Sequence, residues 1–333
     1  MDIPFPDLEK RHFRHILRYS KSTTMKHSNP LSRIMVALDL SEHDEPLISY
    51  VSAKLEMAPI DKIYFVHVVP SLQLPVEIVA KYPDLVAPVD ESVRKSIEYS
   101  IEKFGNFKPD VSIEIVIKEG DTATQLLKTI QEKSIDLLVM GRKNGKEANL
   151  RIVKKVVRTA PCSISIIPEF IPGRFNRLLI PMDFSENSLM AMMRALDFKS
   201  QYPDLQLLTF HGYEVPPGYT RIGKTLDEFS EIMKANAEKE QTNFLKKHNI
   251  AEDQFTPHFI RCKSSHLPSS IYQFAVANNV DAIVIGSRGR DSISALILGS
   301  VTEGLIEHEL FMPLIIIKSK TDYMGLLDSL QEI

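Results

Sequence analysis

The 333-residue sequence lacks several features that would place it in a specialised class of protein. It contains only two cysteines, Cys162 and Cys262, so a framework of disulfides is not indicated and a reducing compartment fits. No apolar run approaches the roughly 20 residues that a membrane-spanning helix needs. The N-terminal residues lack the apolar centre and small-residue cleavage site of a secretory signal. We therefore expect a cytoplasmic protein without a membrane partner.

A strong excess of one charge is also missing. The net charge of −3 gives no reason to expect nucleic acid or an anionic membrane as the main partner. No histidine pair has convincing metal-ligand spacing, no nucleophile stands beside an evident base, and no dinucleotide fingerprint follows the first apolar run of either half. We accordingly predict neither catalytic residues nor a metal centre.

What the chain does contain is a globular composition and an internal repeat. Hydrophobic residues make up 44% and charged residues 25%, and the length suffices for two domains. Residues 33–42 are echoed by 177–186, and residues 136–141 by 281–286. Apolar runs of strand length alternate with helical patterns in both halves. This predicts an α/β protein with two tandem, doubly wound, five-stranded parallel sheets that carry helices on both faces.

The repeat also sets the predicted boundaries. Residues 31–170 form a first domain and 177–320 a second, with a linker at 171–176. The proline-containing segment 70–88 is expected to be a long loop. Outside the repeat, residues 321–333 are a tail and residues 1–30 an extension with basic and apolar residues at helical spacing. That extension is either a partner-docking helix or a solvated appendage.

The stretch that points to function follows the apolar run at residues 282–285. Gly286 and Gly289 mark a loop, and after a nine-residue gap Gly299 and Ser300 open a helical pattern. Glycines let a backbone approach a ligand closely. The first N–H groups of a helix have no intrahelical partner and attract anions. A strand, a glycine-rich loop and a helix start in this order predict a phosphate site.

The spacing G-x2-G-x9-G-S resembles the ATP-binding motif of the universal stress protein family, and the repeated pattern extends that resemblance over most of the chain. The resemblance implies an adenine-nucleotide alpha hydrolase-like fold, with ATP, alone or with Mg²⁺, in the second domain. Asp183, at the end of a strand, would contact ribose or adenine. The other implied contacts are strand-end residues, phosphate-loop glycines and arginines, and first-turn residues of the helix: Pro181, Met182, Gly286, Arg288, Gly289, Arg290, Gly299, Ser300, Val301 and Thr302.

Each of these residues also has a structural explanation. Asp183 could only end a strand, Ser300 could only cap a helix, and the two arginines could be solvated. The sequence also departs from the family pattern in two places. Gly212 stands where the family commonly has an apolar residue that packs on adenine, and His266, near a strand end, is interpreted as a polar rim residue. The base pocket is therefore expected to be looser than usual.

The first domain lacks the phosphate motif. Alignment through residues 160–162 places Leu150 and Arg151 where the glycine–serine pair is expected, although Asp39 remains. Gly145 and Lys146 are a near miss for a P-loop and are interpreted as a solvated turn. We therefore predict one ATP per chain, in the second domain, and a first domain with a degenerate nucleotide site.

The function that the resemblance implies is that of a stress-response protein whose nucleotide state modulates its interactions with an unidentified protein. Two alternatives remain open: a slow ATPase or nucleotide-transferring enzyme, and a ligand-free interaction scaffold. The family also pairs through its last strands. In this chain these are residues 163–167 and 314–317, which implies an intramolecular pseudo-dimer, with a homodimer of chains as a further expectation.

Overall fold

The computed structural model describes residues 31–54, 60–70, 81, 90–169, 175–289 and 298–319. The predicted N-terminal extension, the tail, most of the linker and nearly all of the loop predicted at 70–88 lie outside these residues. We refer to the described residues up to 169 as the first half and to those from 175 onward as the second half.

Strands and helices alternate in the first half in the predicted order. Its elements are β1 (Arg33–Leu38), α2 (Asp44–Lys54), β2 (Lys62–Val69), α4 (Asp90–Phe104), β3 (Ser112–Glu119), α5 (Thr122–Glu132), β4 (Leu137–Arg142), α6 (Glu147–Thr159) and β5 (Ser163–Pro168). Ser41 is of a residue type that favours helix N-caps, but it lies in a turn three residues before α2 and donates to the Asp39 carboxylate instead.

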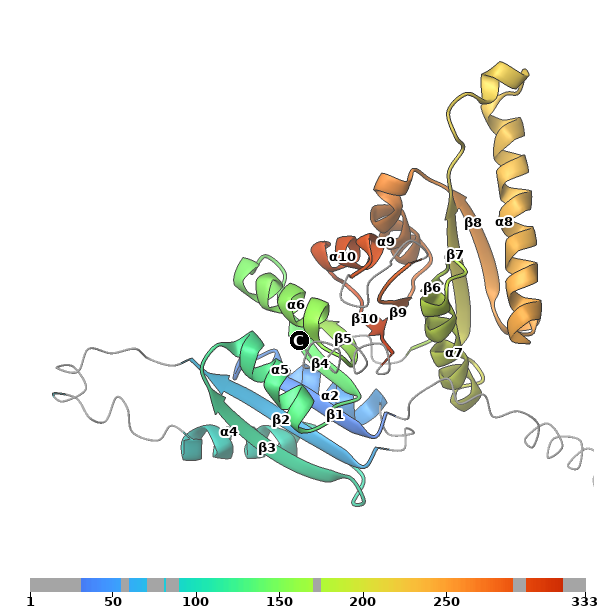
Figure 1. Ribbon diagram of the computed structural model, residues 1–333. Coiled ribbons are helices and arrows are strands. Elements are labelled where there is room, and N and C mark those ends of the chain that lie inside the picture. The colour runs from blue at the N-terminus through green and yellow to red at the C-terminus, as the bar shows by residue number, and fades with distance from the viewer. Residues whose placement is uncertain are drawn as a thin grey trace, which may run out of the picture.

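The second half repeats this order with one much longer helix. Its elements are β6 (Arg177–Pro181), α7 (Glu186–Gln201), β7 (Gln206–Tyr213), α8 (Leu226–His248), β8 (Thr256–Arg261), α9 (Leu267–Ala277), β9 (Ala282–Gly286), α10 (Ser300–Glu307) and β10 (Leu314–Ile317). Here the cap forms, because the Ser185 hydroxyl accepts from the Ser188 amide at the start of α7. In Figure 1, α8 lies along β7 and β8 at the outer side of this half.

All described strands belong to one ten-stranded sheet with the order β3-β2-β1-β4-β5-β10-β9-β6-β7-β8. Neighbouring strands are parallel except at the centre, where β5 and β10 pair antiparallel with Ile315 opposite Ser165. The α/β fold is thereby confirmed, and the last strands of the two halves pair as predicted. Pairing covers two apolar edges that would otherwise be open to other chains.

Asp136 and Asp281 occupy equivalent positions in the two halves, and each binds the backbone at the start of its own half. The Asp136 carboxylate accepts from the backbone N–H groups of Ser32 and Arg33, at 3.0 and 2.7 Å. The Asp281 carboxylate does the same for Asn176 and Arg177, at 2.7 and 2.8 Å. Each aspartate thus connects the start of the fourth strand of its half to the start of the first, and holds the two strands in register.

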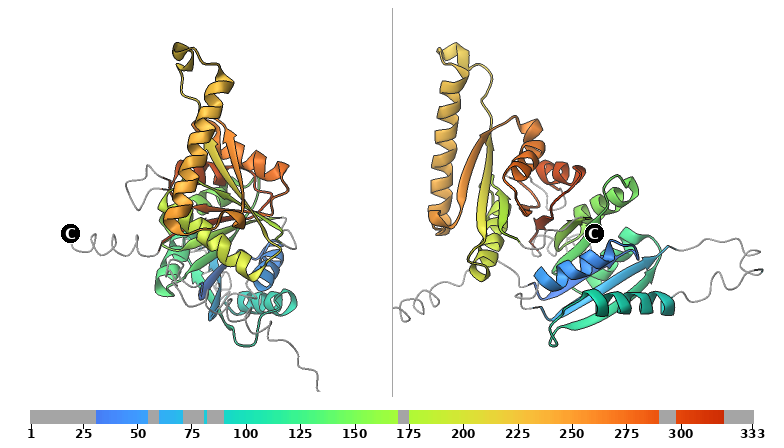
Figure 2. Two further views of the ribbon diagram at one scale, coloured as in Figure 1. Left: turned by 90° about the vertical axis from the view of Figure 1, so that its right-hand side faces the viewer. Right: turned by 180° about the vertical axis from the view of Figure 1, so that it is seen from behind.

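The hydrophobic core differs between the two faces of the sheet. On one face, buried side chains of α5, α6, α9 and α10 form a single cluster that continues across both halves. On the other face there are two separate clusters, one under α2 and α4 and one under α7 and α8. Figure 2 shows the halves from two further directions, with α2 in blue and α7 in yellow-green near their junction.

Candidate nucleotide site

A cavity of about 340 Å³ opens in the second half, at the carboxyl ends of β6 and β9 and the start of α10. Ligands of parallel α/β sheets bind at this end of the strands. Every predicted site residue within the described part of the chain lines the cavity: Pro181, Met182, Asp183, Gly286, Arg288, Gly289, Gly299, Ser300, Val301 and Thr302. Arg290, the remaining one, lies outside the described residues.

Asp183 is held at the mouth of this cavity by a strained turn. The next residue, Phe184, has a φ of 62°, in the left-handed region that non-glycine residues rarely occupy. The Ser185 hydroxyl donates to the Asp183 carboxylate at 2.6 Å. A Cβ atom at Gly289 would lie 2.8 Å from the other carboxylate oxygen. Glycine at 289 therefore lets the loop after β9 pass directly beside the acid.

The start of α10 is positioned by two bonds to the end of β9. The Thr302 hydroxyl donates to the Gly286 carbonyl at 2.9 Å, and the Gly299 amide donates to the Ser287 carbonyl at 2.8 Å. Gly299 is the N-cap residue and has no side chain that could accept from the first turn. Among the described residues, the helix start therefore presents its N–H groups to the cavity without a side-chain cap, an arrangement that favours an anion.

The inner wall of the cavity is apolar. Phe210, Ile271 and Ile285 contribute to it, together with Leu267 from the first turn of α9. A Cβ atom at Gly212 would lie 2.4 Å from the Leu267 Cδ1 atom, so this leucine occupies the space beside the glycine. Leu267 thus provides, from another element, an apolar surface beside Gly212. The predicted loosening of the pocket is therefore offset by Leu267.

Sequence reasoning missed several lining residues: Ser188, Phe210, His211, Ser264, Leu267, Ile271 and Ile285. For His211 the repeat gave a signal in the sequence, because His67 stands at the equivalent position in the first half. Each ring Nδ1 contacts the carbonyl at the end of the neighbouring strand, Leu38 at 3.0 Å and Met182 at 2.8 Å. His266 is exposed and is not part of the lining, in agreement with its interpretation as a rim residue.

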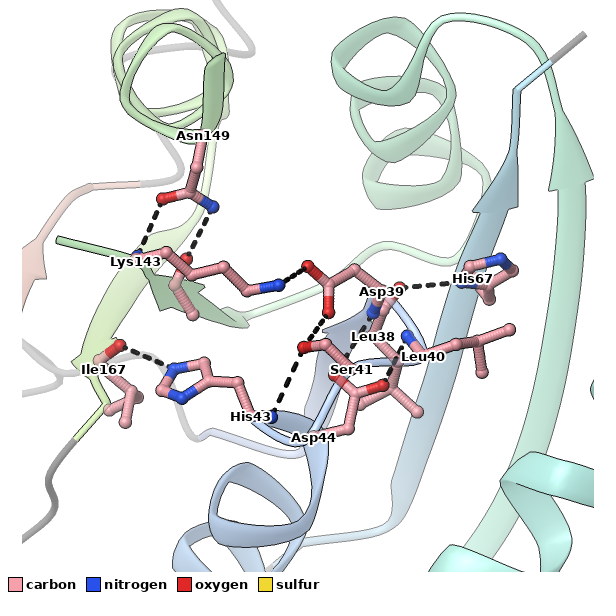
Figure 3. A network of polar contacts seen from close by, with 11 residues as sticks. Leu38, Asp39, Leu40, Ser41, His43, Asp44, His67, Lys143, Asn149 and Ile167 are labelled. Atoms are coloured by element: carbon pink, nitrogen blue, oxygen red, sulfur yellow. Dashed lines mark hydrogen bonds and ion pairs between the residues drawn. The ribbon is translucent and has the colours of Figure 1, made fainter. Parts of the chain in front are cut away.

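The corresponding cavity of the first half is smaller, about 140 Å³, and its polar groups are paired with each other. The Lys143 ammonium forms an ion pair with Asp39 across the cavity (Figure 3). The Asn149 side chain accepts from the Lys143 amide at 3.0 Å and donates to the Gly141 carbonyl at 3.3 Å. The amide and the ammonium group of Lys143 are thus already paired, with Asn149 and Asp39, and neither is left for a phosphate.

The start of α6, the helix that borders the first-half cavity, also differs from the start of α10. α6 has 13 residues and α10 has 8, and α6 already begins at Glu147. Its first turn carries a negative charge where an anion would bind. Leu150, expected to project toward the phosphate position, packs against the shared hydrophobic core and does not line the cavity. The obstruction therefore comes from Asn149 and the Lys143–Asp39 pair. Gly145 and Lys146 are exposed, as predicted for a solvated turn.

Buried titratable groups accompany this network. Burial raises the pKa of Asp44 to about 6, although its carboxylate accepts from the Asp39 and Leu40 amides. Burial lowers the pKa of His43, whose ring Nε2 lies 3.3 Å from the Ile167 carbonyl. Burial also acts to raise the pKa of Asp39, but hydrogen bonds from Lys143 and Ser41 outweigh it and hold that pKa below its ordinary value.

Among the described residues, no cluster of three or more histidine, cysteine, aspartate or glutamate side chains is placed to hold a metal ion. None of the described helices combines the length and apolar character needed to cross a membrane.

Comparison with known proteins identifies the family. The model of the universal stress protein family matches residues 30–168 and again residues 174–315, so the chain belongs to this family and carries its domain twice. A universal stress protein of Methanothermobacter thermautotrophicus is 36% identical over 66 residues, 19% of this chain and 45% of its own length. Universal stress protein MJ0577 of Methanocaldococcus jannaschii is 25% identical over 162 residues, which cover 44% of this chain and 96% of MJ0577.

Solved structures agree on the fold. The crystal structure of a universal stress protein from Archaeoglobus fulgidus matches 87% of this chain and 97% of its own, with a TM-score of 0.54 at 18% identity. Another universal stress protein was solved in complex with cAMP; it is 14% identical and covers 43% of this chain with a TM-score of 0.32.

Proposed function

We propose that the second half binds ATP and that the bound nucleotide changes how the protein interacts with a protein partner. The observation that carries the proposal is the lining of the larger cavity. An acidic residue, a glycine-bounded loop, an arginine and an uncapped helix start converge there around one space. This combination suits a nucleoside phosphate, with an apolar wall for the base and N–H donors for the phosphates.

The division of the cavity into two regions supports a specific orientation. Leu267, Ile271 and Phe210 form the apolar side, where the adenine would pack. Gly299, Ser300 and Arg288 lie on the phosphate side. Asp183 stands at the end of β6 and would accept from a ribose hydroxyl. Mg²⁺, if it accompanies the nucleotide, would bind phosphate oxygens rather than a preformed cluster of protein ligands.

The first experiment identifies the ligand. Small molecules released from the purified native protein are analysed by mass spectrometry, and ATP binding is measured by calorimetry. We expect one ATP site, which Gly289→Val removes because its side chain meets the Asp183 carboxylate. Ala148→Val, on the exposed first turn of α6, is the matched control and should bind normally. A folded Gly289→Val variant that binds ATP like the wild type would contradict the assignment.

A second experiment separates the regulatory role from the alternatives. Proteins that co-purify with the wild type and with Gly289→Val are compared in the presence of ATP. The proposal predicts that the two sets differ, and identical sets would contradict it. Steady phosphate release that Gly289→Val abolishes would instead indicate a slow ATPase. A native protein without nucleotide and without measurable ATP affinity would indicate a scaffold.

A further inference from the structure

A third cavity, of about 210 Å³, lies at the junction of the two halves and is separate from both strand-end cavities. It is located on the sheet face where the hydrophobic core is divided. Val139 of β4, Ser165 of β5, Ile315 of β10 and Leu178 of β6 line it from the sheet. Tyr50 and Ala53 of α2 border it from the first half, and α7 borders it from the second.

The antiparallel pairing of β5 with β10 explains why a space remains at the junction of the two halves. On the opposite face, α6 and α10 contact each other across the β5–β10 pair and fill the centre of the sheet. On this face, α2 packs on β1 and β4, whereas α7 packs on β6, β9 and β10. Within the described part of the chain, the two helices therefore leave the middle of the sheet uncovered between them. Phe175 lies against Tyr50 at the border, with ring centroids 6.1 Å apart.

The cavity is mostly apolar but contains a cationic group. Arg194 of α7 lines it, and its side chain is 14% exposed. The guanidinium lies 3.9 Å from the Asp197 carboxylate, at the outer limit of an ion pair, and the charges of Asp197 and Asp136 both favour its protonated form. Burial lowers the pKa of Arg194, yet a guanidinium stays charged in proteins at neutral pH.

The hydroxyl-bearing side chains of Ser165 and Tyr50 line the same cavity as Arg194. Ser165 is 2% exposed, and its hydroxyl makes no hydrogen bond of normal geometry within the described residues, although it is near enough to influence the Tyr50 phenol. Burial raises the pKa of Tyr50 to about 12, so this group is a protonated donor at neutral pH. A buried hydroxyl that lacks a well-formed hydrogen bond is costly, which favours an acceptor of a ligand beside Ser165 and Tyr50.

We propose that this junction cavity binds a small amphiphilic carboxylate, with its carboxylate against Arg194 and the hydroxyls of Ser165 and Tyr50, and its apolar body between α2, α7 and the central strands. Both a charge-assisted acceptor and an apolar surface are needed to match the lining. A nucleotide does not fit this description, because most of its surface is polar. The site does not depend on the proposed ATP site.

The size of the cavity limits the ligand. A cavity of roughly 150 Å³ accommodates benzene, so this one suits roughly eight to ten non-hydrogen atoms. Octanoate is a suitable probe, and octan-1-ol is its uncharged counterpart of the same length. Longer fatty acids would leave part of their chain outside, at the mouth beside the exposed Ala53.

The test is calorimetric titration of the full chain with both probes. We expect one octanoate per chain and weaker binding of octan-1-ol. Arg194→Met should weaken octanoate binding roughly tenfold or more, with little effect on octan-1-ol, and Arg194→Lys should restore part of the difference. Arg151→Met, at an exposed arginine of α6, is the matched control. Ala53→Trp should block both probes at the mouth without changing ATP binding.

Thermal unfolding of each variant verifies that it is folded. Absence of octanoate binding to the wild type would overturn the proposal. The same conclusion follows if octanoate binds equally well to Arg194→Met and to Ala53→Trp, because the probe would then occupy another place. Octan-1-ol binding as tightly as octanoate in the wild type would overturn the assignment of a carboxylate.

Discussion

At the scale of single residues, Gly289 and Gly299 of the second half each lie so close to a neighbouring group that a side chain would meet it. Gly289 passes beside the Asp183 carboxylate, and a Cβ atom at Gly299 would meet the Arg288 Cα atom at 3.2 Å. Neither residue has a positive φ. Their role is therefore close approach of backbone segments, and it leaves room for a ligand at the start of α10.

Gly299→Asp is expected to abolish ATP binding without unfolding the chain. A carboxylate about 4 Å from a phosphate charge costs about 4 kcal/mol at an effective dielectric constant of about 20, enough to weaken binding by more than roughly a hundredfold. Calorimetry measures the affinity, and circular dichroism the fold. Ala148→Asp adds the same charge to the exposed first turn of α6 and should leave ATP affinity unchanged. Unaltered affinity in a folded Gly299→Asp variant would sink the site assignment.

Asp44 provides a pH-dependent test in the first half. Its pKa is about 6 in the fold against an ordinary value of 3.8, so the folded state holds the proton more tightly between these values. This contribution to stability is complete below pH 4 and is lost as the pH rises through 6. It amounts to about 3 kcal/mol. Asp44→Asn should remove it.

The measurement is urea unfolding at several pH values from 4 to 7. The difference in unfolding free energy between wild type and Asp44→Asn should change across this window. Glu45→Gln, at the exposed neighbouring position of α2, is the control and should follow the wild type. Parallel pH profiles for wild type and Asp44→Asn would contradict the assignment of the raised pKa to Asp44.

At the scale of elements, apolar packing, hydrogen bonds and ion pairs all join the halves. The β5–β10 pair places Ile316, which is fully buried, opposite Ile164. Nearby, α6 and α10 form ion pairs between Lys154 and Glu307 and between Arg158 and Glu303. The side chains of these pairs are between 26% and 54% exposed. Water and salt screen such charges, so the apolar pair should dominate the stability of the joint.

Ile316→Ala is expected to reduce the unfolding free energy by about 2–5 kcal/mol, because it leaves a cavity at the centre of the sheet. Glu307→Gln removes an ion pair across the same joint and should cost less than about 1 kcal/mol. Urea unfolding midpoints measure both. If the Glu307→Gln variant lost as much stability as Ile316→Ala, the joint would be electrostatic rather than apolar.

At the scale of the whole molecule, the two halves share a fold but differ in their strand-end cavities. The cavity of the second half has about 340 Å³ and that of the first about 140 Å³. In the first half, Lys143 and Asn149 take up the polar groups of the loop. The same scaffold therefore presents one open and one internally paired site.

This asymmetry predicts one ATP per chain. Calorimetric titration should give a stoichiometry near one, and Gly299→Asp should remove that single site. Lys143→Ala together with Asn149→Ala enlarges the first cavity but should not create a second ATP site, because α6 still begins with Glu147 and lacks a glycine-rich loop. Two equivalent sites in the wild type, or nucleotide density beside Asp39, would show this interpretation to be wrong.

Much of the fold was predictable from the sequence, because the apolar runs and the glycines act locally. The apolar run at residues 282–285 lies in β9, and the helical pattern opened by Gly299 and Ser300 is α10. The last strands were also assigned correctly as partners. Local periodicity records which residues must be buried, and it therefore predicts the succession of strands and helices along the chain. The pairing of the last strands was implied by the family resemblance and not by periodicity.

The candidate site was predictable where its residues follow one another in the chain. The loop from Gly286 and the start of α10 form a continuous motif, and the acid at Asp183 ends a recognisable strand. Leu267 was missed because its contact with Gly212 crosses from α9 to β7. Asn149 and Lys143 were missed as the groups that fill the first cavity, because a hydrogen bond to a strand end does not leave a pattern in the sequence.

By itself, then, the sequence determined the repeat, the strand and helix order and the phosphate-type motif, all of which depend on neighbours within one turn or one strand. Tertiary structure decided what depends on distant segments. It placed Leu267 beside Gly212 in the apolar wall of the larger cavity and paired Lys143 with Asp39 in the smaller one. It also left a partly polar space at the junction of α2 and α7, since packing of helices around an antiparallel joint is set by the whole sheet.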